Sequence, residues 1–425
     1  MNGSFDPRDP LEAMTAAWAK PDEPHGPPKT NGAASWTEAD KSIKVHDAGD
    51  IDVTKIPPRG WLLGVSFCRK FISGLVAEGG GGKTAIRYAQ YIAAAAGDSG
   101  ITGECVHNRC RVLIVCLEDD LDEVRRRISA ALLHHKVNRE DIRGWVYYCC
   151  PRGLKLLQSG AAGPVIGDLY TELRRLMKEL KIDILGIDPF VKAHGVEEND
   201  NNLIDQVCIM LAQRGDDFDC AVDLVSHARK GSAVPGDADR DRGASSKRDA
   251  GRLMRTLTGM TTDEAERFGV SPKDQAAFVR VDDAKVNITP RSSEAMWFKL
   301  VGVPLGNATT VYPGGDNVQT VERWYPPDVF AKLDAATIAR ILNRIEAGPY
   351  EGGRYSPAAN ATDRAAWPVV QEFCPGTTEK QAKHVINTWI KSGVLVKREH
   401  KDPKDSHEHP SLFVGKRPGN AWETR

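Results

Sequence analysis

A glycine-rich segment between two contrasting runs constrains this chain more than any other stretch. An apolar run, Phe71–Val76, has the character of a buried strand, and a helix-compatible run, Thr84–Ala96, follows. Four consecutive glycines, 79–82, and then Lys83 lie between them. Successive glycines let backbone N–H groups curl around an anion without Cβ clashes, and the following helix directs its positive end at that anion. Strand, glycine loop and helix in this order predict a loop that binds nucleotide phosphates.

The residues after the glycines supply the chemistry that such a loop needs. Lys83 would place a point charge on the β and γ phosphates, and the hydroxyl of Thr84 would ligate Mg²⁺. The consensus loop has glycine where this chain has Ala77, but alanine is small and the four glycines still provide the arc. A dinucleotide fingerprint fits less well, because no G-x-G-x-x-G register places its third glycine here. We therefore expect ATP and Mg²⁺, and the nucleotide-binding residues are predicted to be Ala77, Glu78, Gly79, Gly80, Gly81, Gly82, Lys83, Thr84 and Ala85.

The pattern from about residue 46 to 300 alternates strands with helices. Continuous apolar runs at Arg111–Leu117, Ile182–Asp188 and Cys220–His227 are typical of parallel strands buried on both faces. Amphipathic runs at 121–134 and 168–181 predict helices between them. This alternation indicates an α/β fold with a parallel sheet flanked by helices.

Three regions are predicted along the chain. Residues 1–45 are rich in Pro, Asp and Lys and poor in branched apolar residues, which favours a disordered tail. Residues 46–325 would form the α/β domain and 329–425 a smaller domain. Within the first domain, the polar stretch 229–252 is predicted to be a functional loop, and 306 to about 328 a loop and linker.

The C-terminal region predicts a different architecture. Helices are expected at 336–347 and 365–373, and the capping box Thr378–Gln381 opens a third. Strands at 394–397 and 412–414 follow, around a polar turn. Three helices followed by a hairpin suggest a small winged-helix domain.

Three polar residues end the predicted strands. Asp188 ends an apolar strand where an acid that holds Mg²⁺, directly or through water, belongs. Glu118 follows the strand after the glycine loop and is the candidate for polarising the attacking water, whereas Asp119 or Asp120 would cap the next helix. His227 could bond the γ phosphate and transmit its loss. Because ligands bind at the carboxyl ends of parallel strands, we expect these side chains to meet.

Four segments together carry a resemblance to a known family. They are Ala77–Thr84, Leu117–Asp120, Ile187–Phe190 and Ser226–Gly231. Together they resemble the RecA-like ATPases of the RepA type, which are plasmid and phage replicative helicases with many relatives labelled "AAA family ATPase". The resemblance covers about residues 45–300, and phosphate loops of this family often carry alanine at the first motif position.

The resemblance implies a role for each matching residue. Lys83 and Thr84 would hold phosphates and Mg²⁺, and Glu118 would be the catalytic glutamate. Asp188 would be the Walker B acid and a Mg²⁺ ligand, and His227 the γ-phosphate sensor. Arg242 resembles an arginine finger that acts in the neighbouring subunit's site, with Arg229 and Lys230 as alternatives. A site completed by a neighbour implies a homo-oligomeric assembly, a ring expected to be a hexamer, or a filament if the symmetry does not close.

Composition limits the classes of partner. The net charge of the 425-residue chain is −1, so any nucleic-acid surface must be local. No apolar run is long enough for a membrane span, and the N-terminus lacks the features of a secretory signal, so we expect a cytoplasmic protein. Nine scattered cysteines argue against a disulfide framework. Cys105, His107 and Cys110 could be zinc ligands, but no partner cluster accompanies them.

The C-terminal region carries the local positive charge. Residues 331–425 hold fifteen Lys and Arg and eleven Asp and Glu, a balance of +4. The wing would present the cations Lys397, Arg398, Lys401 and Lys404. The recognition helix would present Lys380, Lys383, His384 and Lys391 to phosphates. Duplex DNA at the winged helix is therefore expected, with protein contact as the alternative use. Single-stranded DNA could thread a ring's channel past the 229–252 loop, held by backbone electrostatics because that loop lacks aromatics.

Three functions remain open on the sequence. The first is a DNA-dependent motor, a replicative helicase of a mobile element. The second is a RecA-like ATPase that binds DNA or partners as a regulator or recombination mediator without unwinding. The third is a P-loop small-molecule kinase, which the C-terminal winged helix disfavours.

Overall fold

The computed structural model describes residues 45–160, 163–197, 200–228, 235–237, 249–292, 294–327, 333–415 and 417. The N-terminal tail expected at 1–45 lies outside the described residues except for residue 45. The chain divides into two compact units. One ends at Thr258 and resumes for Val279–Arg323, and the other combines Gly259–Phe278 with Trp324–Arg425. Residues 259–278, which the sequence-based boundaries place in the first domain, therefore pack in the second unit.

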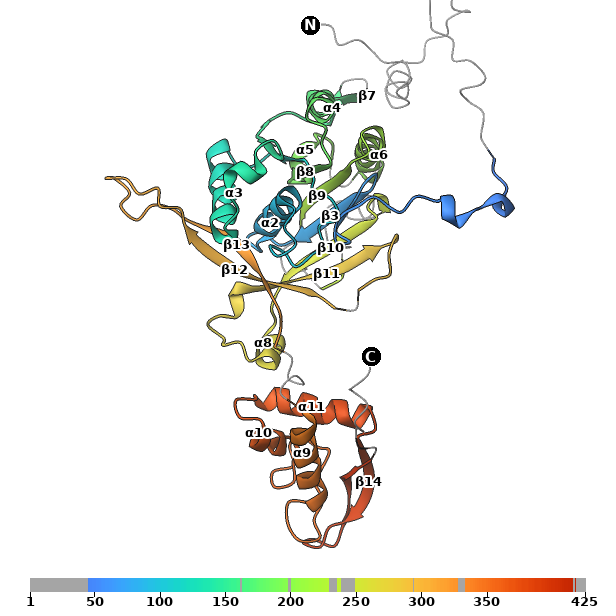
Figure 1. Ribbon diagram of the computed structural model, residues 1–425, viewed down its shortest axis with the longest axis vertical. Helices are drawn as coiled ribbons and strands as arrows, with labels where there is room; N and C mark the ends of the chain where they lie inside the picture. The colour runs from blue at the N-terminus through green and yellow to red at the C-terminus, as the bar shows by residue number, and fades with distance from the viewer. Residues whose placement is uncertain are drawn as a thin grey trace, which may run out of the picture. The chain divides into compact units, whose positions relative to one another are not determined.

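A large sheet forms the centre of the first unit (Figure 1). Among the described residues, nine strands follow the order β13-β12-β11-β10-β3-β9-β8-β4-β5, and the pairings from β10 to β5 are parallel. The strands are β3 (Ile72–Ala77), β4 (Val112–Cys116), β5 (Val146–Cys149), β8 (Ile184–Asp188), β9 (Ala221–His227), β10 (Leu253–Gly259), β11 (Phe278–Val286), β12 (Met296–Pro304) and β13 (Asn317–Trp324).

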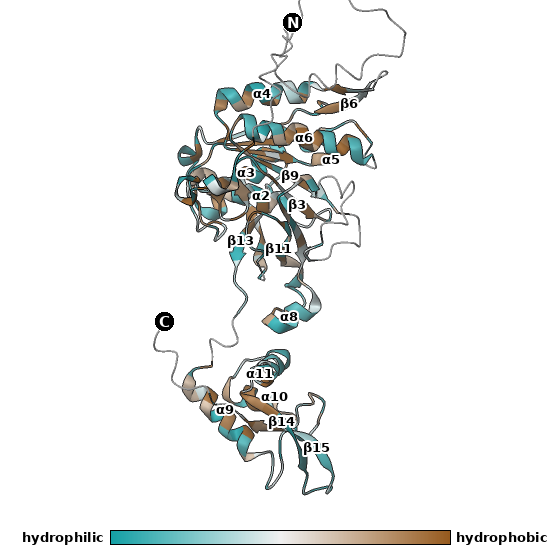
Figure 2. Ribbon diagram, turned by 90° about the vertical axis from the view of Figure 1, so that its right-hand side faces the viewer, coloured by the Kyte–Doolittle hydropathy of each residue, from teal (hydrophilic) through white to brown (hydrophobic). Residues whose placement is uncertain are grey.

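Both faces of the central strands β3, β4, β8 and β9 are buried, as the continuous apolar runs predict. Along β4, Val112 and Ile114 join one apolar cluster, whereas Leu113 and Val115 join another. Because successive strand side chains point to opposite faces, each cluster lies on its own side of the sheet. Helices α2 (Lys83–Ala96) and α3 (Leu121–His135) contribute to the first cluster. The second cluster contains side chains of α4 (Asp168–Leu180), α5 (Phe190–Ala193) and α6 (Asn201–Asp217). Figure 2 shows both hydrophilic and hydrophobic stretches on α4 and α6.

Short elements complete the first unit. They are β1 (Trp61–Leu63), β2 (Phe67–Cys68), β6 (Leu157–Gly160), β7 (Gly163–Ile166) and the 3-10 turns η2 (Ala48–Asp50), η3 (Val53–Lys55) and η4 (Arg139–Ile142). The predicted strands and helices of this region agree with the structure to within one or two residues at each end. The interpretation of 306–328 as loop and linker was wrong, because β13 occupies part of it and joins the edge of the main sheet.

The second unit has a core of its own. Its helices are α8 (Thr262–Phe268), α9 (Ala335–Ala347), α10 (Trp367–Phe373) and α11 (Glu379–Lys391), with the turn η6 (Gln275–Ala277) and the strands β14 (Leu395–Lys401) and β15 (Glu408–Val414). Buried side chains of α9, α10, α11 and both strands form one apolar cluster. The capping box predicted for α11 is confirmed, because the Thr378 hydroxyl accepts from the backbone N–H of Gln381 while the Gln381 side chain accepts from that of Thr378. In the part of the chain that the structure describes, no helix is long and apolar enough to cross a bilayer.

Candidate nucleotide site

The glycine loop connects β3 to α2 in the conformation that its sequence requires. Gly80 and Gly82 have φ values of 77° and 89°, in the left-handed region that favours glycine. A Cβ at Gly82 would also lie 2.6 Å from the Leu300 Cδ2 atom of β12. No side chain caps the start of α2, so the first backbone N–H groups of the helix are left for an anion.

Ala77 departs from the consensus loop, and its place in the fold explains why alanine is tolerated there. It is the last residue of β3, where it pairs in register with His227 of β9 and is fully buried in the core. The methyl group therefore fills core space and does not obstruct the phosphate arc. The turn itself begins after Ala77, where Gly81 N–H donates to the Glu78 carbonyl over 3.2 Å.

Lys83 and His227 meet at the mouth of the loop. The Lys83 Nζ and His227 Nδ1 atoms are 3.0 Å apart, and Lys83 is 6% exposed. Burial lowers the pKa of Lys83, while the charges of Asp188 and Glu118 oppose that shift. A protonated Lys83 can only donate, so His227 accepts at Nδ1 and carries its proton on Nε2. That Nε2 atom lies 3.8 Å from Oε2 of Glu118.

Thr84 and Asp188 form the second contact of the site. The Thr84 hydroxyl donates to Oδ2 of Asp188 over 2.9 Å, which joins the first turn of α2 to the end of β8. Burial raises the pKa of Asp188 to about 6, while the Thr84 hydrogen bond and the Lys83 charge act against the rise. A hydroxyl and a carboxylate side by side are the oxygen ligands that Mg²⁺ prefers. In the described ranges no three His, Cys, Asp or Glu side chains form a metal cluster, so Mg²⁺ here would complete its shell with phosphate oxygens and water.

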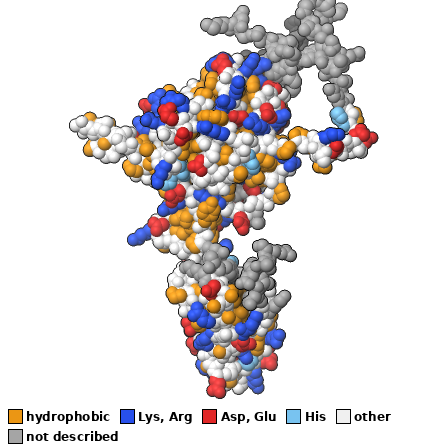
Figure 3. Space-filling view, viewed as in Figure 1, with side chains coloured by type: hydrophobic (Ala, Val, Ile, Leu, Met, Phe, Trp, Pro, Cys, Tyr) orange, Lys and Arg blue, Asp and Glu red, His pale blue; other side chains and the backbone are white. Residues whose placement is uncertain are grey.

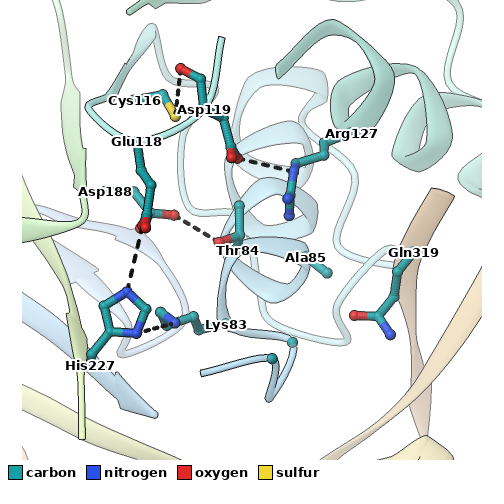
Figure 4. A pocket seen from close by; sticks show the side chains of 12 residues that line it. Lys83, Thr84, Ala85, Cys116, Glu118, Asp119, Arg127, Asp188, His227 and Gln319 are labelled. Carbon is teal, nitrogen blue, oxygen red and sulfur yellow. Dashed lines mark hydrogen bonds and ion pairs between the residues drawn. The ribbon is translucent and has the colours of Figure 1, made fainter. Parts of the chain in front are cut away.

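These residues line one cavity of about 240 Å³ (Figure 4). It collects eight of the predicted site residues: Gly80, Gly82, Lys83, Thr84, Ala85, Glu118, Asp188 and His227. Arg242 and the alternatives Arg229 and Lys230 lie outside the described residues. Sequence reasoning missed four lining residues as members of this site: Cys116, Asp119, Arg127 and Gln319.

Arg127 had a local signal that could have found it. Asp120 is the residue that caps α3, by accepting from the Glu123 N–H over 2.8 Å. Arg127 lies one helical turn beyond Glu123, and its Nε atom lies 2.9 Å from Oε1 of Glu123 and 3.3 Å from Oδ2 of Asp119. The i, i+4 spacing thus returns the guanidinium to the start of α3, beside the pocket. Gln319 had no such signal, because its strand was not predicted.

A buried ion pair supports the two elements that carry Lys83 and His227. Arg87 lies one turn after Lys83 on α2, and Asp223 lies four residues before His227 on β9. Their side chains are 1% and 0% exposed and meet at 2.8 Å. Asp223 also accepts hydrogen bonds from Tyr91 over 2.7 Å and Ser73 over 2.9 Å. Because a buried carboxylate with these donors has one position, α2 and β9 are fixed relative to each other.

The charges of α11 in the second unit are arranged differently. We call Lys380, Lys383, His384 and Lys391 the α11 polar face. Lys380 Nζ lies 2.8 Å from an oxygen of Asp263 and 3.0 Å from one of Glu266, both on α8. Lys383 pairs with Glu379. Lys and Arg are interspersed with Asp and Glu over this unit in Figure 3. The sequence presented these lysines as available to phosphates, whereas the fold places carboxylates beside two of them.

The hairpin β14–β15 keeps its cations in solvent. Lys397, Arg398 and Lys401 are exposed on β14. Arg398 lies over the Phe413 ring at 5.7 Å, and Lys404 in the turn lies over the Tyr350 ring at 3.9 Å. Cations stacked on aromatic faces keep their charge and most of their donors.

Part of this chain matches a protein-family model, and a recombinase is among the solved structures that resemble it. Residues 39–233 match the family model described as an AAA domain. The "Crystal structure of the RadB recombinase" is similar at 12% identity and a TM-score of 0.36, covering 55% of this chain and 88% of that chain. A likeness of this size carries no argument about the present chain. The family match includes the glycine loop, Glu118, Asp188 and His227, and it supports a P-loop ATPase.

Proposed function

We propose that this protein binds and hydrolyses Mg²⁺-ATP in the cavity at the carboxyl edge of the β3, β9, β8 and β4 strands. The observation that carries the proposal is the convergence of Lys83, Thr84, Asp188, His227 and Glu118, from separate elements, on one cavity. Each has the chemistry that phosphoryl transfer to water requires at the place where it is required.

Each residue would act through the atoms described above. The loop N–H groups and Lys83 would hold the β and γ phosphates. Thr84 and Asp188 would hold Mg²⁺, which neutralises phosphate charge when bound. Glu118, whose side chain is 57% exposed, can orient the attacking water and accept its proton.

The Lys83–His227 contact gives the site a way to signal the γ phosphate. A bound γ phosphate would take the Lys83 ammonium as a partner and so compete with Nδ1 of His227. When phosphate leaves, the contact can form again, and β9 would report the change. His227 is therefore proposed as the sensor residue.

The first experiment measures ATP hydrolysis with and without single-stranded DNA, for the intact protein and for Lys83→Ala. Lys83→Ala should reduce turnover by at least about 100-fold, because one charge donor to the transition state is lost. Lys178→Ala, on the exterior of α4, is the matched control and should keep turnover. Hydrolysis that survives Lys83→Ala would overturn the proposal.

We further propose that the ATPase is a DNA-dependent motor of the RepA type that acts in replication of a mobile element, with the second unit as a winged helix. The exposed cations of β14 and its turn support a backbone contact with duplex DNA. The alternative is a DNA-binding regulator or recombination mediator. Stimulation of turnover by single-stranded DNA together with strand separation would support the helicase, and stimulation without separation the alternative.

The proposed assembly is a homo-oligomeric ring, a hexamer, in which Arg242 enters the neighbour's site. Mixing Lys83→Ala with Arg242→Ala protein tests it. Mixed rings can pair an intact Lys83 of one subunit with an intact Arg242 of the next. Recovery of turnover on mixing supports an arginine finger in trans, and Arg229→Ala and Lys230→Ala mixtures distinguish the alternatives. No recovery in any mixture would overturn it.

A further inference from the structure

The cavity has two distinct sides. Figure 4 places His227, Lys83 and Glu118 on one side, and Ala85 and Gln319 on the opposite side. The first side holds the groups proposed above to act on the γ phosphate, which leaves the second side for the remainder of a nucleoside triphosphate. Gln319 belongs to β13, which lies beyond the segment that matches the AAA domain model.

The β12–β13 hairpin is anchored to α3 on both sides of Gln319. Before it, Oδ2 of Asp316 lies 3.0 Å from Nε of Arg126 and accepts from Asn307 over 2.6 Å. After it, Oε2 of Glu322 lies 3.3 Å from Nε2 of His134. Since Arg126 and His134 both belong to α3, these two contacts place β13 beside that helix.

The same hairpin also contacts the phosphate loop. The Leu300 side chain of β12 occupies the space that a Cβ at Gly82 would need, with Cδ2 2.6 Å from that position. The φ of 89° favours glycine at this position, and the Leu300 side chain packs close against it. Arg127, the residue after Arg126, faces the cavity from α3. The hairpin and α3 together therefore wall the cavity on the side away from His227.

We propose that the nucleoside half of the triphosphate lies between α3 and the β12–β13 hairpin, with the Gln319 carboxamide hydrogen-bonded to it. This inference rests on the proposed nucleotide binding and assigns its nucleoside subsite. A carboxamide both donates and accepts, so it suits the mixed donors and acceptors of a base edge or a ribose better than a phosphate, which offers acceptors alone. Gln319 is thus a positioning residue of the nucleoside, outside the phosphate machinery.

Calorimetric titration with two probes tests this assignment, using the Mg²⁺ complexes of ATP and of inorganic tripolyphosphate. Gln319→Ala and Gln319→Leu should weaken ATP binding by about 3- to 10-fold, the loss expected for one neutral hydrogen bond. Tripolyphosphate has no nucleoside, so its affinity should stay within about twofold. Leucine keeps the volume of the glutamine side chain. An equal loss of ATP affinity in Gln319→Leu and Gln319→Ala would therefore assign the loss to the missing hydrogen bond.

Asn317→Ala is the matched control, because Asn317 is exposed on the same strand and does not line the cavity. It should change neither affinity. Equal weakening of both probes by the Gln319 variants, or unchanged ATP binding, would overturn the subsite. Failure of the proposed function itself looks different: the intact protein and Lys83→Ala would then bind ATP alike, which would overturn both proposals.

Discussion

The nucleotide cavity of the first unit and the α11 polar face of the second both gather charged side chains, but with opposite outcomes. In the cavity, Lys83 lies against the imidazole of His227 and Glu118 remains more than half exposed, so both can still meet a ligand. On α11, Lys380 already lies between two carboxylates of α8. A ligand-binding site keeps its charges incompletely compensated, whereas a solvated surface compensates them internally.

Support beneath the two regions differs as well. The cavity rests on the Arg87–Asp223 pair, whose side chains are out of contact with solvent. The Lys380 contacts are open to water on one side, with the Asp263 side chain 88% exposed. A pair of opposite charges therefore determines the local geometry in the first unit, where it is buried. A pair of the same kind has little structural consequence in the second unit, where it is exposed.

The largest effect should come from Glu118→Gln. The amide keeps the size of the side chain but cannot accept a proton from water, so hydrolysis should fall by about 100- to 10,000-fold. ATP affinity should stay near that of the intact protein. Turnover and calorimetric affinity check this, with Asp122→Asn on the exposed start of α3 as control. A large loss of ATP affinity would instead make Glu118 a binding residue.

Asp223→Ala should come next in size. It leaves the Arg87 guanidinium buried without its carboxylate and should destabilise the first unit by about 3–5 kcal/mol. Hydrogen exchange of β9 amides in urea measures this locally. Lys380→Ala, which breaks the exposed pairs, should leave exchange in α11 nearly unchanged. Similar losses in the two units would remove the contrast between them.

Acid should weaken metal binding in the cavity. The raised pKa of about 6 means that Asp188 is ionised above pH 6 and becomes protonated below it. Mg²⁺ requires the carboxylate, so Mg²⁺-dependent ATP affinity should fall about tenfold from pH 7 to pH 5 beyond the change intrinsic to ATP. The pH profile of ATP affinity in Asp188→Asn measures the change that is intrinsic to ATP. Parallel profiles for the two proteins would contradict the role of Asp188.

The raised pKa of Asp188 has the opposite effect on the stability of the protein without ligand: stability falls as the pH rises, whereas Mg²⁺ binding strengthens. Because the folded pKa of Asp188 exceeds the ordinary value of 3.8, the folded state binds more protons between pH 4 and 6. The contribution of Asp188 to stability should therefore decrease as pH rises through this window. Chemical unfolding of intact and Asp188→Asn protein across the window measures it.

The smallest effect concerns DNA. If the hairpin of the second unit contacts phosphates, Lys397→Ala should reduce the slope of log affinity against log salt by about 1. Lys380→Ala should leave the slope unchanged, because Asp263 and Glu266 already neutralise it. Fluorescence anisotropy with duplex DNA compares the two. A larger effect of Lys380→Ala on this slope would mean that Lys380 exchanges its carboxylate partners on α8 for DNA phosphates.

The sequence by itself determined the parts of this protein whose causes are local. The glycine loop, the apolar runs and the capping box of α11 act through neighbouring residues, so pattern alone located β3, α2, β8, β9 and α11. Because parallel strands present their carboxyl ends at one edge, the meeting of Glu118, Asp188 and His227 with Lys83 also followed from order along the chain.

Only the tertiary structure decided the rest. Gln319 reaches the cavity because β13 joins a sheet edge and is held by α3, and no periodicity near residue 319 encodes that contact. Lys380 contacts Asp263 and Glu266, which lie more than a hundred residues earlier in the chain, so it is no longer available to phosphates. Long-range pairs depend on which surfaces the folded chain brings together, and a sequence pattern records only the propensities of neighbouring residues.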